Sequence, residues 1–375
     1  MQKKIKLAIV LGTRPEIIRL SRVISLARER FDVSLIHTGQ NYHPMLSNVF
    51  FEDLKLDRPD ILLDCAGETP AKTIANVISE TDNVFTEIKP DALLVLGDTN
   101  SCLSALSAKR QRIPIFHMEA GNRCFDLRVP EEINRKMVDH LADINMPYSS
   151  IARGFLVDEG FPKDQIVKTG SPMKEVLDFY SQDINNSPIL RRLSLQSKKY
   201  FLISLHREEN ISSRRSILEF CKCLNALALE YRYPVIVSVH PRLQKQLDKA
   251  RTPLDSKVFL CEPFGFFDYC YLQKNAKVVL SDSGTIAEET ALLGFDALNL
   301  RETHERHEGM EEAVVMMVGV KTERIFQGIE ILCKQSKPAT QLGKVVDYEV
   351  ENVSEKVTRI IPSYIDYVNL KTWRR

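Results

Sequence analysis

The chain has 375 residues, of which 27% are charged and 44% hydrophobic, and its formal net charge is +1. This length exceeds one ordinary core and fits two α/β domains of globular composition. The near-zero net charge excludes a bulk electrostatic attraction to nucleic acid or to an anionic membrane, so we expect neither as a partner. Any anion must therefore be bound by individually placed groups.

The N-terminal segment MQKKIKLAIVLGT places basic residues before an apolar run, as a signal peptide does. The apolar run is short, lacks a small-residue cleavage site and ends in Gly-Thr-Arg-Pro. It therefore reads as a first buried strand. No other stretch approaches the ~18 apolar residues of a membrane span, and we expect a cytoplasmic protein.

The eight cysteines are scattered, with no CxxC and no Cys/His cluster at zinc spacing. They predict reduced, mostly buried thiols and no metal site. Cys221 and Cys223 are the one close pair, in a helical segment that should point them to different sides.

In the first half of the chain, short β-branched runs alternate with longer amphipathic segments, which predicts βαβ units and a parallel sheet. The predicted strands are 6–12, 32–39, 92–98 and 113–119, with weaker candidates in INMPY and QIVKTG. The predicted helices include 15–30 and 99–112. Each main strand ends in Gly, His, Asp or Glu, at the carboxyl edge where open α/β sheets hold ligands.

A second set of strands follows residue 185. Its predicted strands are 200–206, 235–240, 258–263, 277–284 and 296–301. The fold class is therefore α/β, with two Rossmann-like doubly wound domains facing each other across a cleft. We place them at 1–172 and 185–352, and expect the amphipathic helix 353–370 to return to the first domain.

The first strand-to-helix loop, LGTRPEIIR, contains neither GxGxxG nor GxxxxGK[ST]. A dinucleotide fingerprint and a P-loop are thus both absent. Pro15 suits the first helical position and leaves Arg14 at a helix N-terminus, where phosphate binding is favoured. An arginine in a solvated loop is the alternative.

Three acids follow predicted strands of the first domain or open the next helix. Asp98 ends one strand, Glu119 ends the next, and Glu131 begins a helix beside Glu132. Each acid alone could be a loop residue or a complement to a helix dipole. Three carboxylate-bearing loops converging on one sheet edge favour acid/base chemistry.

The second domain carries cations and small residues at equivalent strand ends. His206 and Arg207 follow one strand, and His240 and Arg242 follow another, an arrangement that suits an anionic ligand. Strand-end histidines also serve as packing or capping groups. In SDSGTIAEE, Ser283 and Gly284 could offer hydroxyl and N–H groups to phosphate, and Glu288 and Glu289 could accept ribose hydroxyls. HxxH at 304–307 lies outside the HExxH pattern, so we expect no metal there.

These motifs together resemble the non-hydrolysing UDP-N-acetylglucosamine 2-epimerases over nearly the whole chain. The matching segments, in order, are GTRPE, GDTNS, HMEAG with PEEINR, HRE, VHP, SDSGTIAEE and ERHE. The resemblance implies a GT-B-like architecture, a UDP-linked 2-acetamido sugar as ligand, no cofactor, and a homodimer. It also implies a reaction in which the C2 proton is removed as UDP leaves C1. UDP then adds back to C1 while a proton returns on the opposite face of C2.

The resemblance also implies residue roles. It makes Asp98, Glu119 and Glu131 the catalytic acids and bases, with His206 as a further participant. The implied nucleotide-diphosphate contacts are Arg14, His206, Ser283, Gly284, Glu289 and Arg306. Arg19 stands where the typical member has Lys, and we place it with Arg207 and His240 among the substrate-binding residues.

Departures from the family pattern bear on the sugar. The segment 39–45 reads GQNYHPM where the family reads AQHxxM, so regulation by a second nucleotide sugar is open. The loop 121–140 replaces the usual G-L-R-T loop and resembles the subgroup that makes UDP-N-acetyl-L-fucosamine from UDP-2-acetamido-2,6-dideoxy-L-talose, for capsule and O-antigen polysaccharides. Apolar Phe125 and Val129 would suit a 6-deoxy sugar, although they could equally pack the loop.

Four alternatives stay open. The first is interconversion of UDP-GlcNAc and UDP-ManNAc. A GT-B glycosyltransferase shares the architecture but needs no set of three acids. A hydrolysing epimerase releases free sugar, and a non-enzymatic nucleotide-sugar binder needs no acids at all.

Overall fold

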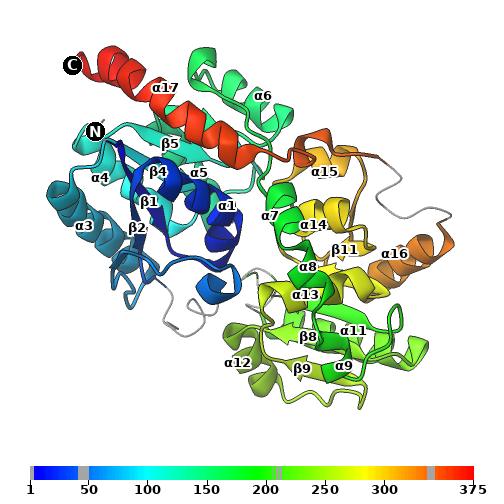
Figure 1. The fold of residues 1–375 in the computed structure, drawn as a ribbon. Coiled ribbons are helices and arrows are strands. Elements are labelled where there is room, and N and C mark those ends of the chain that lie inside the picture. The colour runs from blue at the N-terminus through cyan, green and yellow to red at the C-terminus, as the bar shows by residue number, and fades with distance from the viewer. Residues whose placement is uncertain (1–3, 41–49, 206, 208–209, 211–212, 336–342) are drawn as a thin grey trace. The chain divides into compact units, whose positions relative to one another are not determined.

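The computed structural model describes residues 4–40, 50–205, 207, 210, 213–335 and 343–375. The chain forms two compact units. The first contains Met1–Phe179 and Val346–Arg375, and the second contains Tyr180–Val345. Each unit is built around one parallel sheet with helices packed on it (Figure 1).

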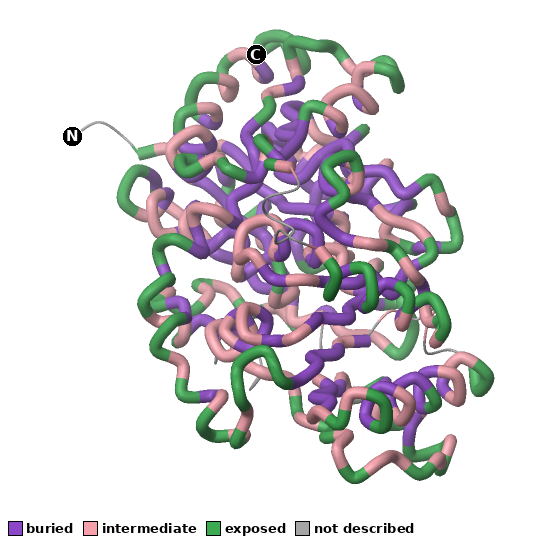
Figure 2. The backbone as a smooth tube through the Cα atoms, turned by 90° about the vertical axis from the view of Figure 1, so that its right-hand side faces the viewer, coloured by how far each residue is buried: buried purple, intermediate pink, exposed green. Residues whose placement is uncertain are grey.

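The sheet of the first unit has six parallel strands in the order β3-β2-β1-β4-β5-β6. The strands are β1 (Lys6–Leu11), β2 (Asp32–His37), β3 (Ile61–Leu62), β4 (Ala92–Leu96), β5 (Ile115–Met118) and β6 (Ile144–Met146). The central strands are buried along almost their whole length, as a parallel sheet covered on both faces requires (Figure 2). Continuous apolar runs, and not alternating ones, are the sequence pattern of such strands.

The helices of the first unit cover this sheet. They are α1 (Arg14–Arg30), α3 (Pro70–Ile88), α4 (Ser104–Arg110), α5 (Pro130–Leu141), α6 (Ser150–Asp158), α7 (Met173–Phe179) and α17 (Val353–Trp373). Thr13 precedes α1 at the N-cap position, and Pro15 lies in the first turn of this helix, where its missing N–H costs no hydrogen bond.

The C-terminal helix α17 belongs to the first unit although the second unit precedes it in sequence. It packs on α1, with Val357 and Ile361 fully buried. Arg30 of α1 donates to Glu355 of α17 at 2.6 Å, and Lys356 donates to the carbonyl of Thr169 at 2.9 Å. Figure 1 shows this helix in red beside the N-terminal elements in blue.

The second unit repeats the strand order of the first. Its sheet runs β12-β11-β10-β7-β8-β9, again with parallel pairs throughout. The strands are β7 (Phe201–Leu205), β8 (Val235–Val239), β9 (Val258–Cys261), β10 (Val278–Ser281), β11 (Ala297–Asn299) and β12 (Met316–Met317). The helices are α8 (Ser181–Asn185), α9 (Ile189–Arg192), α11 (Arg214–Tyr231), α12 (Pro241–Ala250), α13 (Phe266–Asn275), α14 (Ile286–Leu293), α15 (His307–Glu311) and α16 (Thr322–Lys334).

In both sheets the chain order reverses between the first strand and the fourth. These pairs are β1 with β4 in the first unit and β7 with β10 in the second. The loops that leave the carboxyl ends of such a pair run to opposite faces of the sheet and open a crevice between them. Ligand-binding residues are therefore expected in the loops after these four strands.

The predicted fold class is confirmed, while several local predictions need correction. QIVKTG forms only a single bridge, between Ile166 and Asn145, and the short edge strands β3 and β12 were not predicted. Cys221 and Cys223 on α11 are both buried in the core of the second unit. All eight cysteines are free, and six are buried. Within the described part of the chain, no helix is both long and apolar enough to cross a membrane.

Candidate functional site

Glu16 joins the loops that follow β1 and β4. Glu16 is 1% exposed, and its carboxylate accepts from four N–H and O–H donors, the N–H of Gly12 (3.0 Å) and the hydroxyls of Thr13 (2.7 Å), Thr99 (3.0 Å) and Ser101 (2.5 Å). The thiol of Cys102 makes a longer contact at 3.9 Å. Burial raises the pKa of Glu16, although all four donors act in the opposite direction. This one side chain thus fixes two loops at the point where the strand order reverses.

Arg14 begins α1 on the same edge. Its guanidinium carbon lies 5.5 Å from the centre of the Phe50 ring, a cation–π geometry. Burial lowers the pKa of Arg14 from its ordinary value. The side chain is half-buried at a helix N-terminus, where an anion is favoured.

Glu119 follows β5 directly and forms an ion pair with Arg19 of α1. Both side chains are nearly buried. The backbone of Glu119 is left-handed, with φ +65°, an unusual conformation for a residue with a side chain. The other carboxylate oxygen accepts from the amide of Asn122 at 3.3 Å. Arg19 therefore contacts the predicted catalytic acid itself.

Asp98 lies at the end of the neighbouring strand β4 and is held by Arg135 of α5. Two guanidinium nitrogens of Arg135 donate to the same oxygen of Asp98, at 3.0 and 2.6 Å. Arg135 also donates to the buried carboxylate of Glu132 at 3.0 Å. Asn134 donates to the backbone carbonyl of Asp98 at 3.0 Å, which ties α5 to the Asp98 turn.

The two acids that open α5 have different environments. Glu132 is fully buried and accepts from the N–H groups of Cys124 (3.0 Å) and Phe125 (3.2 Å), so it organises the preceding loop. Glu131 is partly exposed in the first turn of the helix. The structure thus places Asp98, Glu119 and Glu131 at the carboxyl edge of one sheet, after β4, after β5 and at the start of α5.

In the second unit, Asp282 links the loops after β7 and β10. It is fully buried and accepts from the N–H of Arg207 at 2.8 Å and from the amide of Asn210 at 3.1 Å. His206, which the sequence singled out, lies outside the described residues. His240 caps α12 by accepting from the N–H of Arg242 at 3.4 Å, the capping role that the sequence left open.

The loop between β10 and α14 is closely packed. Ser283 and Thr285 share a hydroxyl contact at 2.9 Å, and Thr285 donates to Glu289 at 2.6 Å. The other oxygen of Glu289 accepts from Gln273 at 2.5 Å. Glu289 thus has internal partners for both carboxylate oxygens. A Cβ on Gly284 would lie 2.1 Å from a carboxylate oxygen of Glu305, so any larger residue here requires that side chain or the loop to shift.

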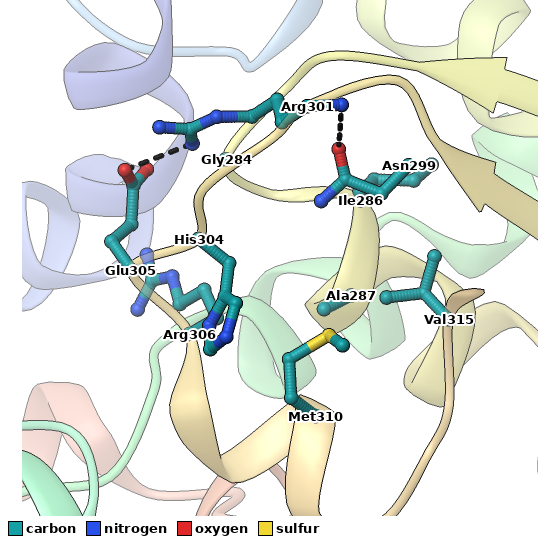
Figure 3. Close-up of a pocket in the computed structure, with 10 residues that line it drawn as sticks. All are labelled: Gly284, Ile286, Ala287, Asn299, Arg301, His304, Glu305, Arg306, Met310 and Val315. Carbon is teal, nitrogen blue, oxygen red and sulfur yellow. Dashed lines mark hydrogen bonds and ion pairs between the residues drawn. The ribbon is translucent and has the colours of Figure 1, made fainter. Parts of the chain in front are cut away.

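A small pocket beside this loop gathers buried charges (Figure 3). Glu305 accepts from Arg301 at 2.9 Å and lies 3.4 Å from Arg207, while Arg306 lies 3.8 Å from Glu288. Burial, together with the charges of His307 and Arg301, lowers the pKa of His304. Among the residues that the structure describes, no group of three His, Cys, Asp or Glu side chains could hold a metal ion.

Several residues that organise the two sites were not predicted from the sequence. Thr13 and Glu16 match the T-x-x-E pattern of a capping box, which could have identified Glu16. Arg135 and Glu305 lie in the matching segments PEEINR and ERHE, but no local signal shows that they pair with Asp98 and Arg207, which lie in other segments of the chain. Five of the predicted residues lie at the carboxyl edge of the first sheet: Arg14, Arg19, Asp98, Glu119 and Glu131. Five others lie near one another in the second unit: Arg207, Ser283, Gly284, Glu289 and Arg306.

Two parallel six-stranded sheets flanked by helices define a two-domain α/β protein of the GT-B-like class. The family model described as UDP-N-acetylglucosamine 2-epimerase matches residues 25–362. A Methanocaldococcus jannaschii protein named UDP-N-acetylglucosamine 2-epimerase is 33% identical over 344 residues, with 88% of this chain and 93% of that protein covered. The chain belongs to the UDP-N-acetylglucosamine 2-epimerase family.

Two further similarities agree with this assignment. A Rickettsia bellii structure described as UDP-N-acetylglucosamine 2-epimerase superimposes with a TM-score of 0.91 at 44% identity, covering 99% of this chain and 100% of that one. A Pseudomonas aeruginosa protein named UDP-2,3-diacetamido-2,3-dideoxy-D-glucuronate 2-epimerase is 31% identical, with 91% of this chain and 93% of that protein covered. Such enzymes are UDP-sugar 2-epimerases that act without hydrolysis, and the protein is an isomerase of this kind.

Replacement of Glu16 by alanine should destabilise the first unit. The change leaves four donors without their acceptor, and each buried polar group without a partner costs about 1–3 kcal/mol. We therefore expect a loss of at least ~2 kcal/mol in unfolding free energy, measured by calorimetry of the full chain. Glu29→Ala, at an exposed position of the same helix, should stay within about 0.5 kcal/mol of wild type. Equal stability of the two variants would contradict the role assigned to Glu16.

Proposed function

We propose that the enzyme inverts C2 of UDP-2-acetamido-2,6-dideoxy-L-talose to give UDP-N-acetyl-L-fucosamine, by elimination and re-addition of UDP. The observation that carries this proposal is the pair of carboxylates Asp98 and Glu119, which follow adjacent strands and each contact an arginine. Relatives named for 2-epimerisation of UDP-linked sugars support the same reaction class. A structure of the Methanocaldococcus jannaschii enzyme in complex with UDP-GlcNAc and UDP supports a UDP-linked acetamido sugar as ligand.

The reaction explains why several acids are required. The C2 hydrogen of a sugar is barely acidic, so departure of UDP from C1 must accompany its removal. An inverted product also needs proton transfer on both faces of C2, because one group returning its own proton would regenerate the substrate. We assign these transfers to Asp98, Glu119 and Glu131.

The leaving diphosphate needs positive charge and N–H donors. We assign this role to Arg14 in the first unit and to Arg207, Arg306, Ser283 and Gly284 in the second. Glu289 would reach a ribose only by giving up the contacts it makes with Thr285 and Gln273. His206 remains a proposed participant from the sequence.

The loop before α5 supports a 6-deoxy sugar. Phe125 is 64% exposed, and its ring meets Phe155 of α6 edge-on at 5.3 Å. The buried carboxylate of Glu132 accepts a hydrogen bond from the N–H of Phe125, so the backbone that carries this exposed ring is held in place. Such a surface suits a methyl group at C6 better than a hydroxyl. Val129 is buried and packs the loop, so it takes no part in the proposal.

Interconversion of UDP-GlcNAc and UDP-ManNAc is the second candidate. It is favoured by the names of the relatives, including the Rickettsia bellii structure at 44% identity. The two candidates share the same reaction and differ in the group at C6 and in the sugar series.

Incubation in D2O separates them. With UDP-2-acetamido-2,6-dideoxy-L-talose, we expect NMR to show inversion and deuterium at C2, at a kcat/KM at least tenfold above that with UDP-GlcNAc. The reverse preference would replace the proposed substrate by UDP-GlcNAc. Release of free sugar would indicate hydrolysis, and no exchange with either compound would overturn the proposed reaction.

Asp98→Asn and Glu119→Gln should abolish turnover while leaving UDP affinity within a few-fold of wild type. Both changes keep the shape of the side chain and remove its basicity, and losses of 10²–10⁴-fold are typical for such groups. Turnover is followed by NMR and UDP binding by calorimetry. Asp158→Asn, at an exposed position of α6, is the matched control and should keep full activity. A large loss of UDP binding would make the two acids nucleotide ligands instead.

Gly284→Ala should weaken UDP binding by at least tenfold. The added methyl group would overlap the Glu305 carboxylate and displace either that acid or the loop at the start of α14. Calorimetric titration with UDP measures the effect. Gly154→Ala on α6 adds the same methyl group where no atom lies within 4 Å, so it should bind UDP as wild type does. Unchanged binding by Gly284→Ala would remove this loop from the proposed UDP site.

A further inference from the structure

His117 is a fully buried histidine beneath the proposed catalytic acids. It lies on β5, two residues before Glu119. Its Nε2 atom is 2.7 Å from the carbonyl oxygen of Gly97, the residue before Asp98. Its Nδ1 atom is 3.0 Å from a carboxylate oxygen of Asp139 on α5. One ring therefore touches the turn that carries Asp98 and the helix that opens with Glu131.

The ring nitrogens both face oxygen acceptors. The Gly97 carbonyl can only accept, so Nε2 must carry a hydrogen. Asp139 accepts from Arg123 at 2.7 Å and from the N–H of Gly121 at 3.2 Å. The other oxygen of this carboxylate lies 3.0 Å from Nδ1, so a hydrogen on Nδ1 would lie between the ring and an acceptor.

The surrounding charges agree with a protonated ring. Burial alone lowers the pKa of His117, but Asp139, the Gly97 carbonyl and the charge of Asp98 outweigh it, and the pKa is raised. These acids are the charged groups that face the ring from the loop after β4 and from α5. Arg123 is held on the other side of Asp139, where Glu159 accepts from it at 2.7 Å.

We propose that His117 is a positively charged positioning residue that fixes the Gly97–Asp98 turn and sets the charge beside the proton-transfer acids. The inference rests on the proposed function of Asp98 and Glu119. Gly97 adopts a left-handed backbone at φ +77°, and the imidazolium holds its carbonyl in that orientation. Because Asp98 follows at once, a rotation of this peptide would move the carboxylate.

The protonation state can be tested on the wild-type protein without any substrate. With 15N-labelled histidine, both ring nitrogens of His117 should show one-bond coupling to hydrogen from about pH 6 to about pH 8, across the ordinary histidine pKa of ~6.5. His117→Gln identifies the signal by its loss. A single protonated nitrogen at the upper pH would overturn the proposal. This result is independent of the proposed function, because it requires no turnover.

The positioning role can be tested with the same variant. His117→Gln keeps one donor and removes the charge, and we expect kcat to fall about 100-fold with KM changed only a few-fold, because small displacements of catalytic groups cost this much. Loss of a cation beside Asp98 makes that carboxylate easier to protonate. The acid limb of the pH profile should therefore move to higher pH, which a purely structural defect would not produce.

His140→Gln is the matched control, since His140 is exposed on the same helix as Asp139, where its ring contacts the carbonyl of Lys136 at 2.8 Å and the ring of Phe161. It should retain the kcat and pH profile of wild type. Superimposable profiles of His117→Gln and wild type would overturn the positioning role. If His117→Gln does not fold, the ring signals of His117 are assigned through its backbone resonances in the wild-type protein, and that result decides the charge.

Discussion

A carboxylate buried at the end of a parallel sheet stays ionised only where a cation or several donors lie against it, and both units depend on this constraint. In the first unit, Arg19 forms an ion pair with Glu119, and Arg135 forms one with Asp98. The four N–H and O–H groups of described residues that donate to Glu16 are all uncharged, and burial raises the pKa of this carboxyl group. A buried carboxylate at this edge can therefore pair with a guanidinium or serve as a hydrogen-bonded tie between two loops.

The fold places each of these carboxylates next to its arginine. The reversal of strand order between β1 and β4 leaves room at the carboxyl edge, and the adjacent ladder of β4 and β5 places Asp98 and Glu119 at neighbouring strand ends. Helices α1 and α5 then bring arginines to the two acids from separate segments. The sheet thus determines the positions of the two acids, and the helices supply the arginines that pair with them.

Much of this architecture was predictable because it depends on local patterns. Continuous β-branched runs identify buried parallel strands, and acids directly after such runs must lie at the carboxyl edge. The partners were not predictable. Arg19 and Glu119 are 100 residues apart, and no periodicity in either segment encodes their meeting. His117 appeared as the first residue of the matching segment HMEAG but received no role, since its contacts with Gly97 and Asp139 are made by tertiary packing. The two-residue strands β3 and β12 are too short to produce any pattern.

The two sheets share one strand order, but an ion pair at each sheet differs in whether the acid or the arginine is the more exposed partner. In the first unit the acid is the more accessible member of its pair, since Asp98 is 23% exposed and Arg135 only 2%. In the second unit, Arg207 is 15% exposed and its partner Glu305 is 9%, while Arg301, which also pairs with Glu305, is 1% exposed. Proton transfer requires an accessible carboxylate, whereas binding of a diphosphate requires an accessible cation with its counter-charge behind it. A duplicated strand order can therefore serve two chemistries when the identity of the buried partner is exchanged.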